Sequence, residues 1–259
     1  MELSNKVAVV TGGAKGIGFA SGECLLRQGA AVMLVDISAD ALREATERLS
    51  HLNGEVDSVV CDIARAAETE RAIQRTVERF GSVDILVNNA GIQTYGDAVT
   101  TTEEIWDRTM DVNLKGHWLM SKSAIPEMLK RGGGTIVNVS SVQGLASQQN
   151  VLAYATSKHA MIGLTRSMAI DLASRKIRVN CVCPGTVNTP LIQGVLALDP
   201  NPEKLRNILN RMHPIGRMAE PAEIGEVVAF LSSARASFMT GSIVTVDGGL
   251  LIPIAGSPE

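Results

Sequence analysis

The stretch Val7-Ala8-Val9-Val10-Thr11-Gly12-Gly13-Ala14-Lys15-Gly16-Ile17-Gly18 decides how this chain folds. Four apolar, mostly β-branched residues run directly into a glycine-rich turn, and a helical pattern follows from Gly16 to about Gln28. Glycines let the backbone turn sharply, and the helix that follows directs its N-terminal amides and its dipole at the turn. The stretch therefore predicts a strand–turn–helix unit that holds the pyrophosphate of a dinucleotide.

The alternation of strand-like and helix-like patterns continues along the whole chain. Strand-like apolar runs cover Ala31–Val35, Ser58–Cys61, Ile85–Val87, Thr135–Val139, Arg178–Val182 and Ser242–Val246. Helix-like segments between them cover Ala39–Ser50, Ala66–Phe80, Glu103–Arg131, Tyr154–Ala173 and Ala222–Leu231. Near-continuous apolar strands between helices predict a parallel sheet with helices on both faces. We predict an α/β fold, a single doubly wound Rossmann-like domain over residues 1–259.

Residues Asn188–Pro214 are expected to be the least regular part of the chain. Asp199-Pro200-Asn201-Pro202 breaks this segment in two. Two interpretations stay open, a mobile lid over a substrate site and a surface insertion without such a role.

Composition and charge exclude several classes of protein. The formal net charge is −3, and without a basic stripe a nucleic-acid partner has no electrostatic support. No apolar run has the length of a membrane span or of a signal-peptide core, so we expect no membrane partner and a cytoplasmic location. The cysteines form no C-x-x-C pair and the histidines no metal-ligand spacing, which predicts buried free thiols and no metal site.

The end of the second strand-like run bears on the choice of cofactor. Asp36 stands there, and a carboxylate in this place accepts hydrogen bonds from the adenosine ribose and repels a 2′-phosphate. Ile37, which follows, is apolar. These residues predict NAD rather than NADP, although the basic Lys15 favours the opposite choice and leaves NADP open.

The segment Tyr154-Ala155-Thr156-Ser157-Lys158 places a phenol and an ammonium four residues apart, on one face of a helix. An ordinary phenol has a pKa of about 10, too high for a base near neutral pH. An ammonium at about 4 Å, in an effective dielectric of about 20, contributes at most about 4 kcal/mol, or roughly three pKa units. We therefore expect Lys158 to lower the pKa of Tyr154.

Several short motifs occur in a fixed order around this pair. They are T-G-x-x-x-G-x-G from Thr11 to Gly18, Asn88-Asn89-Ala90-Gly91, Asn113, Ser140-Ser141, the Y-x-x-x-K segment, Pro184-Gly185-Thr186-Val187-Asn188-Thr189-Pro190 and Val246-Asp247-Gly248-Gly249. Together they resemble the short-chain dehydrogenase/reductase family, over nearly the whole chain.

The resemblance implies a role for each catalytic residue. Tyr154 is the general base in oxidation and the general acid in reduction, and Lys158 binds the nicotinamide ribose. Ser141, chosen over Ser140 by its separation from Tyr154, orients the substrate oxygen, and Asn113 holds a water that links Lys158 to solvent. The expected cofactor-binding residues are Gly12, Lys15, Gly16, Ile17, Gly18, Asp36, Asp62, Ile63, Asn89, Ala90, Gly91, Tyr154, Lys158, Pro184, Gly185, Val187 and Thr189.

The substrate is less constrained than the cofactor. Gln93, Gln143 and Gln149 lie near the catalytic motifs and suit a polar substrate such as a sugar or polyol, or else they are surface amides. The prediction is an NAD-dependent oxidoreductase that moves hydride between nicotinamide and a secondary alcohol or ketone. The alternatives are an NADPH-dependent 3-oxoacyl thioester reductase and a non-catalytic NAD-binding sensor or scaffold. The resemblance also implies a homo-oligomer, with a tetramer favoured, assembled through helices Glu103–Arg131 and Tyr154–Ala173.

Overall fold

Within the part of the chain that the computed structural model describes, residues 1–52 and 54–252, seven parallel strands form one sheet. The strands are β1 (Val7–Thr11), β2 (Ala31–Asp36), β3 (Val56–Val60), β4 (Ile85–Asn88), β5 (Gly134–Val139), β6 (Ile177–Pro184) and β7 (Ile243–Val246). Their order in the sheet is β3-β2-β1-β4-β5-β6-β7. The strand order reverses between β1 and β4, since β2 and β3 extend the sheet on one side of β1 and β4 to β7 extend it on the other. Open α/β sheets bind their ligands at such a switch point, beyond the carboxyl ends of the strands.

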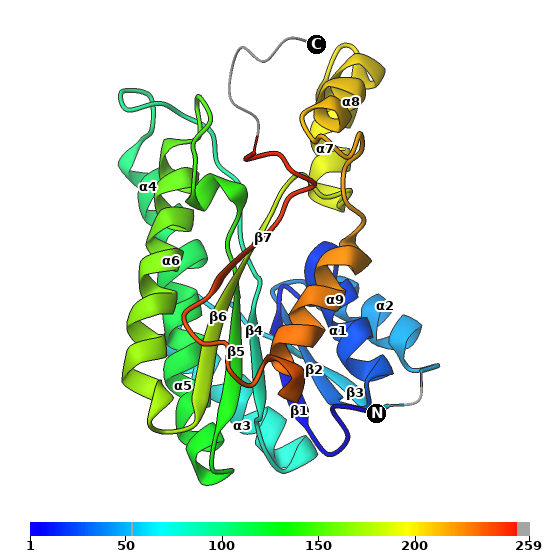
Figure 1. The fold of residues 1–259 in the computed structure, drawn as a ribbon, viewed down its shortest axis with the longest axis vertical. Helices are drawn as coiled ribbons and strands as arrows, with labels where there is room; N and C mark the ends of the chain where they lie inside the picture. Colours follow the sequence, from blue (N-terminus) through cyan, green and yellow to red (C-terminus); the bar gives the residue numbers. More distant parts are fainter. Residues whose placement is uncertain (53, 253–259) are drawn as a thin grey trace.

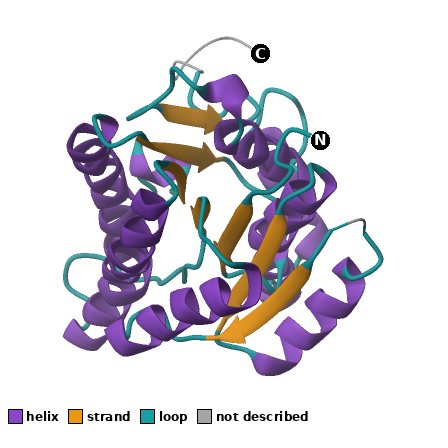
Figure 2. Cartoon of the chain, turned by 90° about the horizontal axis from the view of Figure 1, so that it is seen from below, coloured by secondary structure: helices purple, strands orange, loops and turns teal. Residues whose placement is uncertain are grey.

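Helices cover both faces of this sheet, as Figures 1 and 2 show. One core contains residues of α1 (Gly16–Arg27), α2 (Ala39–Leu49) and α9 (Pro221–Ser232). The second core contains residues of α3 (Ala66–Phe80), α5 (Gly116–Lys130) and α6 (Leu152–Ala173). Strand β1 contributes to both, because successive side chains point to opposite faces: Ala8 and Val10 lie in the first core and Val9 in the second. The predicted doubly wound fold is confirmed.

The helix predicted over Glu103–Arg131 is interrupted. Helix α4 (Glu103–Met110) continues through a π-helical turn, Asp111–Lys115, into α5. Asn113 is the buried residue of that turn. Single π turns within α-helices are frequent at functional sites, where the wider turn changes the direction of a side chain.

The expectation that Asn188–Pro214 is the least regular part of the chain is wrong. Two helices form there, α7 (Pro190–Leu198) and α8 (Pro202–Arg211), each with a proline in its first turn, where the missing N–H has no partner to lose. The Asn201 side chain caps α8 by accepting from Lys204 N–H. No residue of α8 is buried, and Figure 1 shows both helices (yellow) rising at the end of the molecule to which the strands run.

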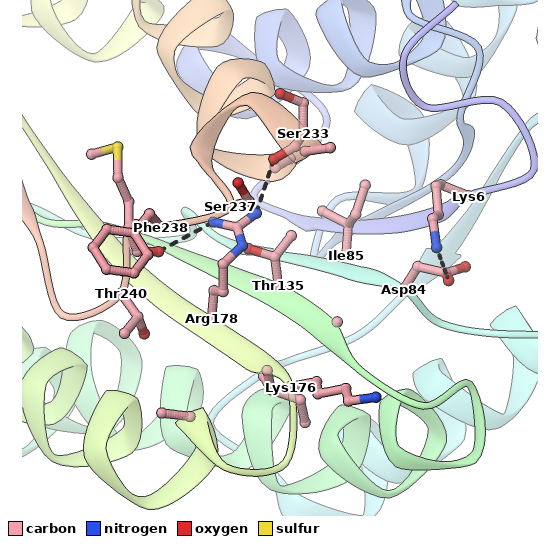
Figure 3. A pocket seen from close by; sticks show the side chains of 16 residues that line it. Lys6, Asp84, Ile85, Thr135, Lys176, Arg178, Ser233, Ser237, Phe238 and Thr240 are labelled. Atoms are coloured by element: carbon pink, nitrogen blue, oxygen red, sulfur yellow. Dashed lines mark hydrogen bonds and ion pairs between the residues drawn. The ribbon is translucent and has the colours of Figure 1, made fainter.

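The opposite end of the sheet, at the amino ends of β4, β5 and β6, contains a cavity of about 630 Å³ (Figure 3). The Arg178 guanidinium lies in its wall and donates to the carbonyls of Leu231 and Ser233 at 2.9 and 3.1 Å. Lys6 pairs with the buried Asp84 at 3.0 Å. These charged groups hold chain segments together, and none of the predicted catalytic or cofactor residues lines this cavity.

Three further properties concern the described residues, 1–52 and 54–252. No helix among them has the length and apolar character needed to cross a membrane. No three His, Cys, Asp or Glu side chains among them gather closely enough to hold a metal ion. The four cysteines are free and buried, as predicted.

Candidate active site

The glycine turn after β1 packs closely against the loop after β4. A Cβ atom on Gly12, whose φ is +61°, would lie 2.9 Å from Ala90 Cα, and one on Gly18 would lie 2.1 Å from Gly12 O. Asn89 Nδ2 donates to the Thr11 and Gly12 carbonyls at 3.0 and 3.3 Å. Only glycine allows this approach, which leaves a smooth backbone surface at the start of α1.

The loop after β6 borders the other side of this turn. A Cβ on Gly16, whose φ is +56°, would lie 3.2 Å from Thr189 Cγ2. Within the same loop Val187 is buried and pairs with Ala219 in an isolated bridge. The structure thus brings two predicted cofactor residues together, Gly16 of the glycine turn and Thr189 of the loop after β6. Ile17 is half-buried and packs against the first core.

The Asp36 carboxylate faces back toward the glycine turn. One oxygen accepts from Ala14 N–H at 3.3 Å and the other from Ser38 N–H at 3.2 Å. The Ile37 side chain is 70% exposed. Lys15 is exposed as the residue before α1. A carboxylate and an ammonium therefore border the same turn.

The predicted cofactor residues after β3, Asp62 and Ile63, are only partly accessible. The Asp62 carboxylate accepts from Ala64 N–H at 3.0 Å and lies 3.4 Å from Arg65 Nε. The Ile63 side chain is buried, in space left open by Gly116, where a Cβ would come within 2.7 Å of it. The Ile63 side chain is therefore not available to a ligand at this edge.

Tyr154 and Lys158 lie one turn apart on α6 at the carboxyl end of the sheet. Lys158 is almost fully buried, and its ammonium donates to the Val139 carbonyl at 3.0 Å. Its Nζ is 5.7 Å from the centroid of the Tyr154 ring. Burial lowers the pKa of Lys158 to about 8, because it disfavours the charged form.

The pKa of Tyr154 is raised, which is opposite to the expected lowering by Lys158. Burial of the phenol is the largest cause, and the nearby Ser141 hydroxyl acts in the other direction by hydrogen bonding. The Lys158 ammonium is bonded to Val139 rather than to the phenol. In the protein alone, desolvation of the phenol outweighs any effect of the ammonium.

The two serines after β5 have different environments. Ser140 is buried, and its hydroxyl donates to the Lys158 carbonyl at 2.8 Å, so it holds the strand end against α6. Ser141 is partly exposed, and its Oγ accepts from Gln143 N–H at 3.1 Å. Ser141 is thus the serine that lies beside Tyr154 with access to the site.

Asn113, in the π turn, joins the loop after β4 to α6. Its Oδ1 accepts from Ile92 N–H at 2.8 Å, and its Nδ2 donates to the Ile92 carbonyl at 2.8 Å and to Ser157 Oγ at 3.1 Å. Ser157 in turn donates to the Tyr154 carbonyl at 2.7 Å. Sequence reasoning missed Ser157, although it stands inside the Y-x-x-x-K segment.

Gly91 lies next to both polar groups of this region. A Cβ on Gly91 would be 3.3 Å from Asn113 Oδ1 and 3.6 Å from Lys158 Nζ. A larger residue would therefore fill the space between the amide and the ammonium.

The loops that carry the three glutamines meet at a short bridge between Gly96 and Val151. Gln143 Nε2 donates to Gln148 Oε1 at 3.1 Å, while its own Oε1 is buried without a hydrogen-bond partner among the described residues. Gln93 is half-buried and Gln149 is exposed. Tyr95 also lies near the site, and its phenol raises the pKa of Tyr154.

Comparison with known proteins agrees with this geometry. A family model described as enoyl-(acyl carrier protein) reductase matches residues 12–251. Dehydrogenase/reductase SDR family member 4 from Pongo abelii is 39% identical over 251 residues, which are 95% of this chain and 88% of that protein. The chain belongs to the short-chain dehydrogenase/reductase family. It is accordingly an oxidoreductase that acts on CH–OH groups, or the corresponding carbonyls, with NAD or NADP.

Two further relatives cover almost the full length of this short-chain dehydrogenase/reductase. The 3-oxoacyl-[acyl-carrier-protein] reductase FabG from Thermotoga maritima is 38% identical over 252 residues, 97% of this chain and 100% of that protein. The ligand-free structure of Thermoplasma acidophilum aldohexose dehydrogenase superposes with a TM-score of 0.89 at 38% identity, covering 99% of this chain and 98% of that one.

Proposed function

We propose that this protein is an NAD-dependent dehydrogenase/reductase of a polar secondary alcohol or ketone, such as a sugar or polyol. The observation that carries the proposal is the convergence of Ser141, Tyr154 and Lys158 at the carboxyl end of the sheet, beside the glycine turn that Asp36 faces. This arrangement supports the proposal, because hydride transfer to a bound substrate requires a nucleotide-binding turn and an acid–base group at one edge of the sheet.

The turn around Gly12 and Gly18 fits a dinucleotide, because without side chains at these positions its backbone packs closely on itself and on the loop after β4. We assign the phosphates to this turn and the start of α1, and the adenosine ribose to Asp36. Pro184, Gly185, Val187 and Thr189 hold the nicotinamide end in the loop after β6. The charge of Asp36 selects against a 2′-phosphate, and this favours NAD.

When bound, a nicotinamide would supply or accept the hydride, and the protein would move the proton. In reduction, the Tyr154 phenol donates its proton to the substrate oxygen. The raised pKa of Tyr154 keeps the phenol in the protonated form that this step needs. The Ser141 hydroxyl holds the substrate oxygen beside the phenol. Lys158 holds the nicotinamide ribose, and Asn113 holds the water through which Lys158 exchanges protons with solvent.

Turnover tests this assignment; it is monitored through the absorbance of reduced nicotinamide, with NAD and NADP supplied separately. Tyr154→Phe is expected to reduce kcat by at least about 10³-fold, because it removes the proton donor but leaves the ring in place. Tyr95→Phe is the matched control, since Tyr95 is the other tyrosine of the sequence and lies near the site. Full activity in Tyr154→Phe would refute the proposed acid–base role.

Gln143 Oε1 is buried and has no hydrogen-bond partner within residues 1–52 and 54–252, and this supports a polar substrate. An acceptor in this state is satisfied when a substrate hydroxyl donates to it, and a site of this kind discriminates strongly against analogues that lack the hydroxyl. We assign Gln93, Gln143 and Gln149 to this substrate region. The similarity to an aldohexose dehydrogenase makes aldohexoses the first substrates to assay.

A second candidate activity is reduction of a 3-oxoacyl thioester with NADPH. The exposed Lys15 beside the glycine turn favours it by offering a cation to a 2′-phosphate, and a relative of similar identity is a 3-oxoacyl-[acyl-carrier-protein] reductase. Turnover of acetoacetyl thioesters with NADPH, faster than of any polyol with NAD, would establish this activity instead.

We also propose a homotetramer in the cytoplasm. The outer faces of α4, α5 and α6 expose Trp106, Trp118 and Ile170, and Ile170 is 81% exposed. Exposed large apolar side chains on these three helices favour a surface that another copy of the chain covers. Light scattering of the full chain checks the assembly, and a monomer at micromolar concentration would refute it.

A further inference from the structure

His213 connects the two ends of the segment that carries α7 and α8. It follows α8, and its side chain is buried with 2% exposure. Its Nδ1 lies 2.8 Å from the Leu209 carbonyl, and its Nε2 lies 3.0 Å from Thr186 N. A carbonyl only accepts and a backbone N–H only donates, so the ring is neutral and carries its hydrogen on Nδ1. Nε2 is therefore the acceptor for Thr186.

The backbone that His213 contacts is held from several sides. The Thr186 carbonyl accepts from Ala219 N–H at 3.0 Å, and Gly185 N–H donates to the Val246 carbonyl at 3.0 Å. A Cβ on Gly185 would lie 2.8 Å from His213 Nε2, so the ring packs directly on the loop backbone. The imidazole thus fixes the Gly185–Thr186 region against the end of α8.

The two hydrogen bonds of His213 have different consequences. The bond to Leu209 stays within the end of α8 and would orient the ring by itself. The bond to Thr186 crosses to the loop after β6, where the segment begins. The His213 side chain therefore links the position of the end of α8 to the position of the loop after β6.

We propose that His213 is a positioning residue for the nicotinamide end of the site. Through Nε2 it holds the Thr186 peptide, so that the loop from Pro184 to Thr189 keeps the shape that receives the ring while α7 and α8 are in place. The proposal rests on the proposed function, which assigns this loop to the nicotinamide. It predicts that the Thr186 bond, and not the Leu209 bond, determines activity.

Two substitutions separate these bonds. His213→Asn keeps an amide nitrogen near the Nδ1 position, where it donates to Leu209, but it leaves Thr186 N–H without an acceptor. His213→Gln places its amide oxygen near the Nε2 position and accepts from Thr186. A buried donor left unsatisfied corresponds to about a 10-fold effect, so we expect His213→Asn to lose about 10-fold in kcat/KM and in NADH affinity. His213→Gln is expected to stay within about 3-fold of the parent.

Asn210→Ala is the matched control at the end of the same helix. It removes the acceptor of Met218 N–H, at 3.1 Å, and leaves the Thr186 bond intact. Activity close to that of His213→Gln supports the proposal. A loss as large as that of His213→Asn would show that any loosening of α8 has the same effect, and would overturn it.

The measurements distinguish this proposal from the function on which it rests. If the parent protein binds neither NADH nor NADPH, the assignment of the site fails, and His213 with it. If the parent turns over substrate and the Asn and Gln variants lose activity equally, only the role of His213 is refuted. Should His213→Asn not fold, hydrogen exchange at the Thr186 amide decides: protection kept in an active His213→Gln supports the proposal, and lost protection with full activity overturns it.

Discussion

Gly18→Ala tests the packing on which cofactor binding depends. The added methyl would lie 2.1 Å from Gly12 O and 2.5 Å from Asn89 Nδ2, whereas ordinary contact begins at 3.4 Å. The two groups must therefore separate by about 1.3 Å, the difference between 3.4 and 2.1 Å. Because Gly12 O is backbone, rotation of a side chain gives no relief. The start of α1 has to move away from the turn.

The size of the effect follows from this displacement. Extra volume in a well-packed region costs about 1–3 kcal/mol, and helix propensity returns about 0.5–1 kcal/mol when glycine becomes alanine. A misplacement of about 1 Å in a binding site lowers affinity or rate by about 100-fold. We therefore expect a small loss of stability and about a 100-fold rise in the Kd for NADH.

Gly22→Ala provides the matched control, one turn further along the same helix. Its methyl would lie 3.0 Å from Leu34 Cδ2, the end of a flexible side chain, and 3.7 Å from Val32 Cγ1. These side chains can adjust without moving the turn. We expect its NADH affinity to remain within about 3-fold of the parent and its free energy of unfolding to change by less than about 1 kcal/mol.

The assay is NADH fluorescence titration of the three proteins, together with denaturant unfolding. Parental NADH affinity in Gly18→Ala would refute the placement of the phosphates at this turn. An equal loss in both variants would show that α1 tolerates no added methyl at all, and the argument from the 2.1 Å contact would fail.

Three further perturbations address the cofactor, the buried lysine and the α7–α8 segment. Asp36→Ala is expected to weaken NAD binding by about 10- to 100-fold, the effect of a hydrogen bond to a charged group, and to improve NADP binding; an unchanged ratio of the two Kd values would contradict the assignment of Asp36. Lys158→Met is expected to abolish turnover yet raise the free energy of unfolding near pH 7 by about 2 kcal/mol, since burial lowers the pKa of Lys158 from 10.5 to about 8 and the lost bond to Val139 offsets part of the gain. Between pH 8 and 10.5, Lys158 of the parent binds fewer protons in the folded than in the unfolded state, so the destabilisation from its burial is complete below about pH 8 and disappears as the pH rises to about 10.5. Denaturant unfolding should show the stability difference between Lys158→Met and the parent shrinking over that range. A stability difference independent of pH would contradict burial of the charge as its cause. We also propose residues 188–214 as a lid: limited proteolysis there should slow when NADH and substrate are added, and unchanged cleavage would favour a passive insertion.

Much of the fold was predictable because local pattern and tertiary environment agree. The run Val7–Val10 is apolar on both sides since β1 contributes to both cores, and such a run is typical of a central parallel strand. Helices α1 and α9 pack closely where Gly225 leaves room, with a Cβ there only 2.8 Å from Ala20 O. That contact joins residues about two hundred positions apart and has no local signature.

The helices in Asn188–Pro214 were missed for a different reason. Turn residues such as Asp199 and Pro200 suggest an irregular segment, whereas prolines 190 and 202 each stand at the first position of a helix. Proline fits the first turn of a helix, and its meaning depends on which side the helix lies. No pattern of buried apolar residues marks α8, because none of its residues is buried.

The π turn at Asp111–Lys115 shows why the motif of Asn113 indicated a role but not a geometry. Asn113 satisfies the N–H and C=O of Ile92 and the hydroxyl of Ser157, from the loop after β4 and from α6. These three bonds are tertiary, and together they stabilise a widened turn that no helix propensity favours. The same bonds hold the loop after β4 and α6, which carries Tyr154 and Lys158, at a fixed separation. Asn113 is distant in sequence from Tyr154 and Lys158, yet its hydrogen bonds determine the geometry of these proton-transfer groups. Its effect on activity should therefore exceed its effect on stability.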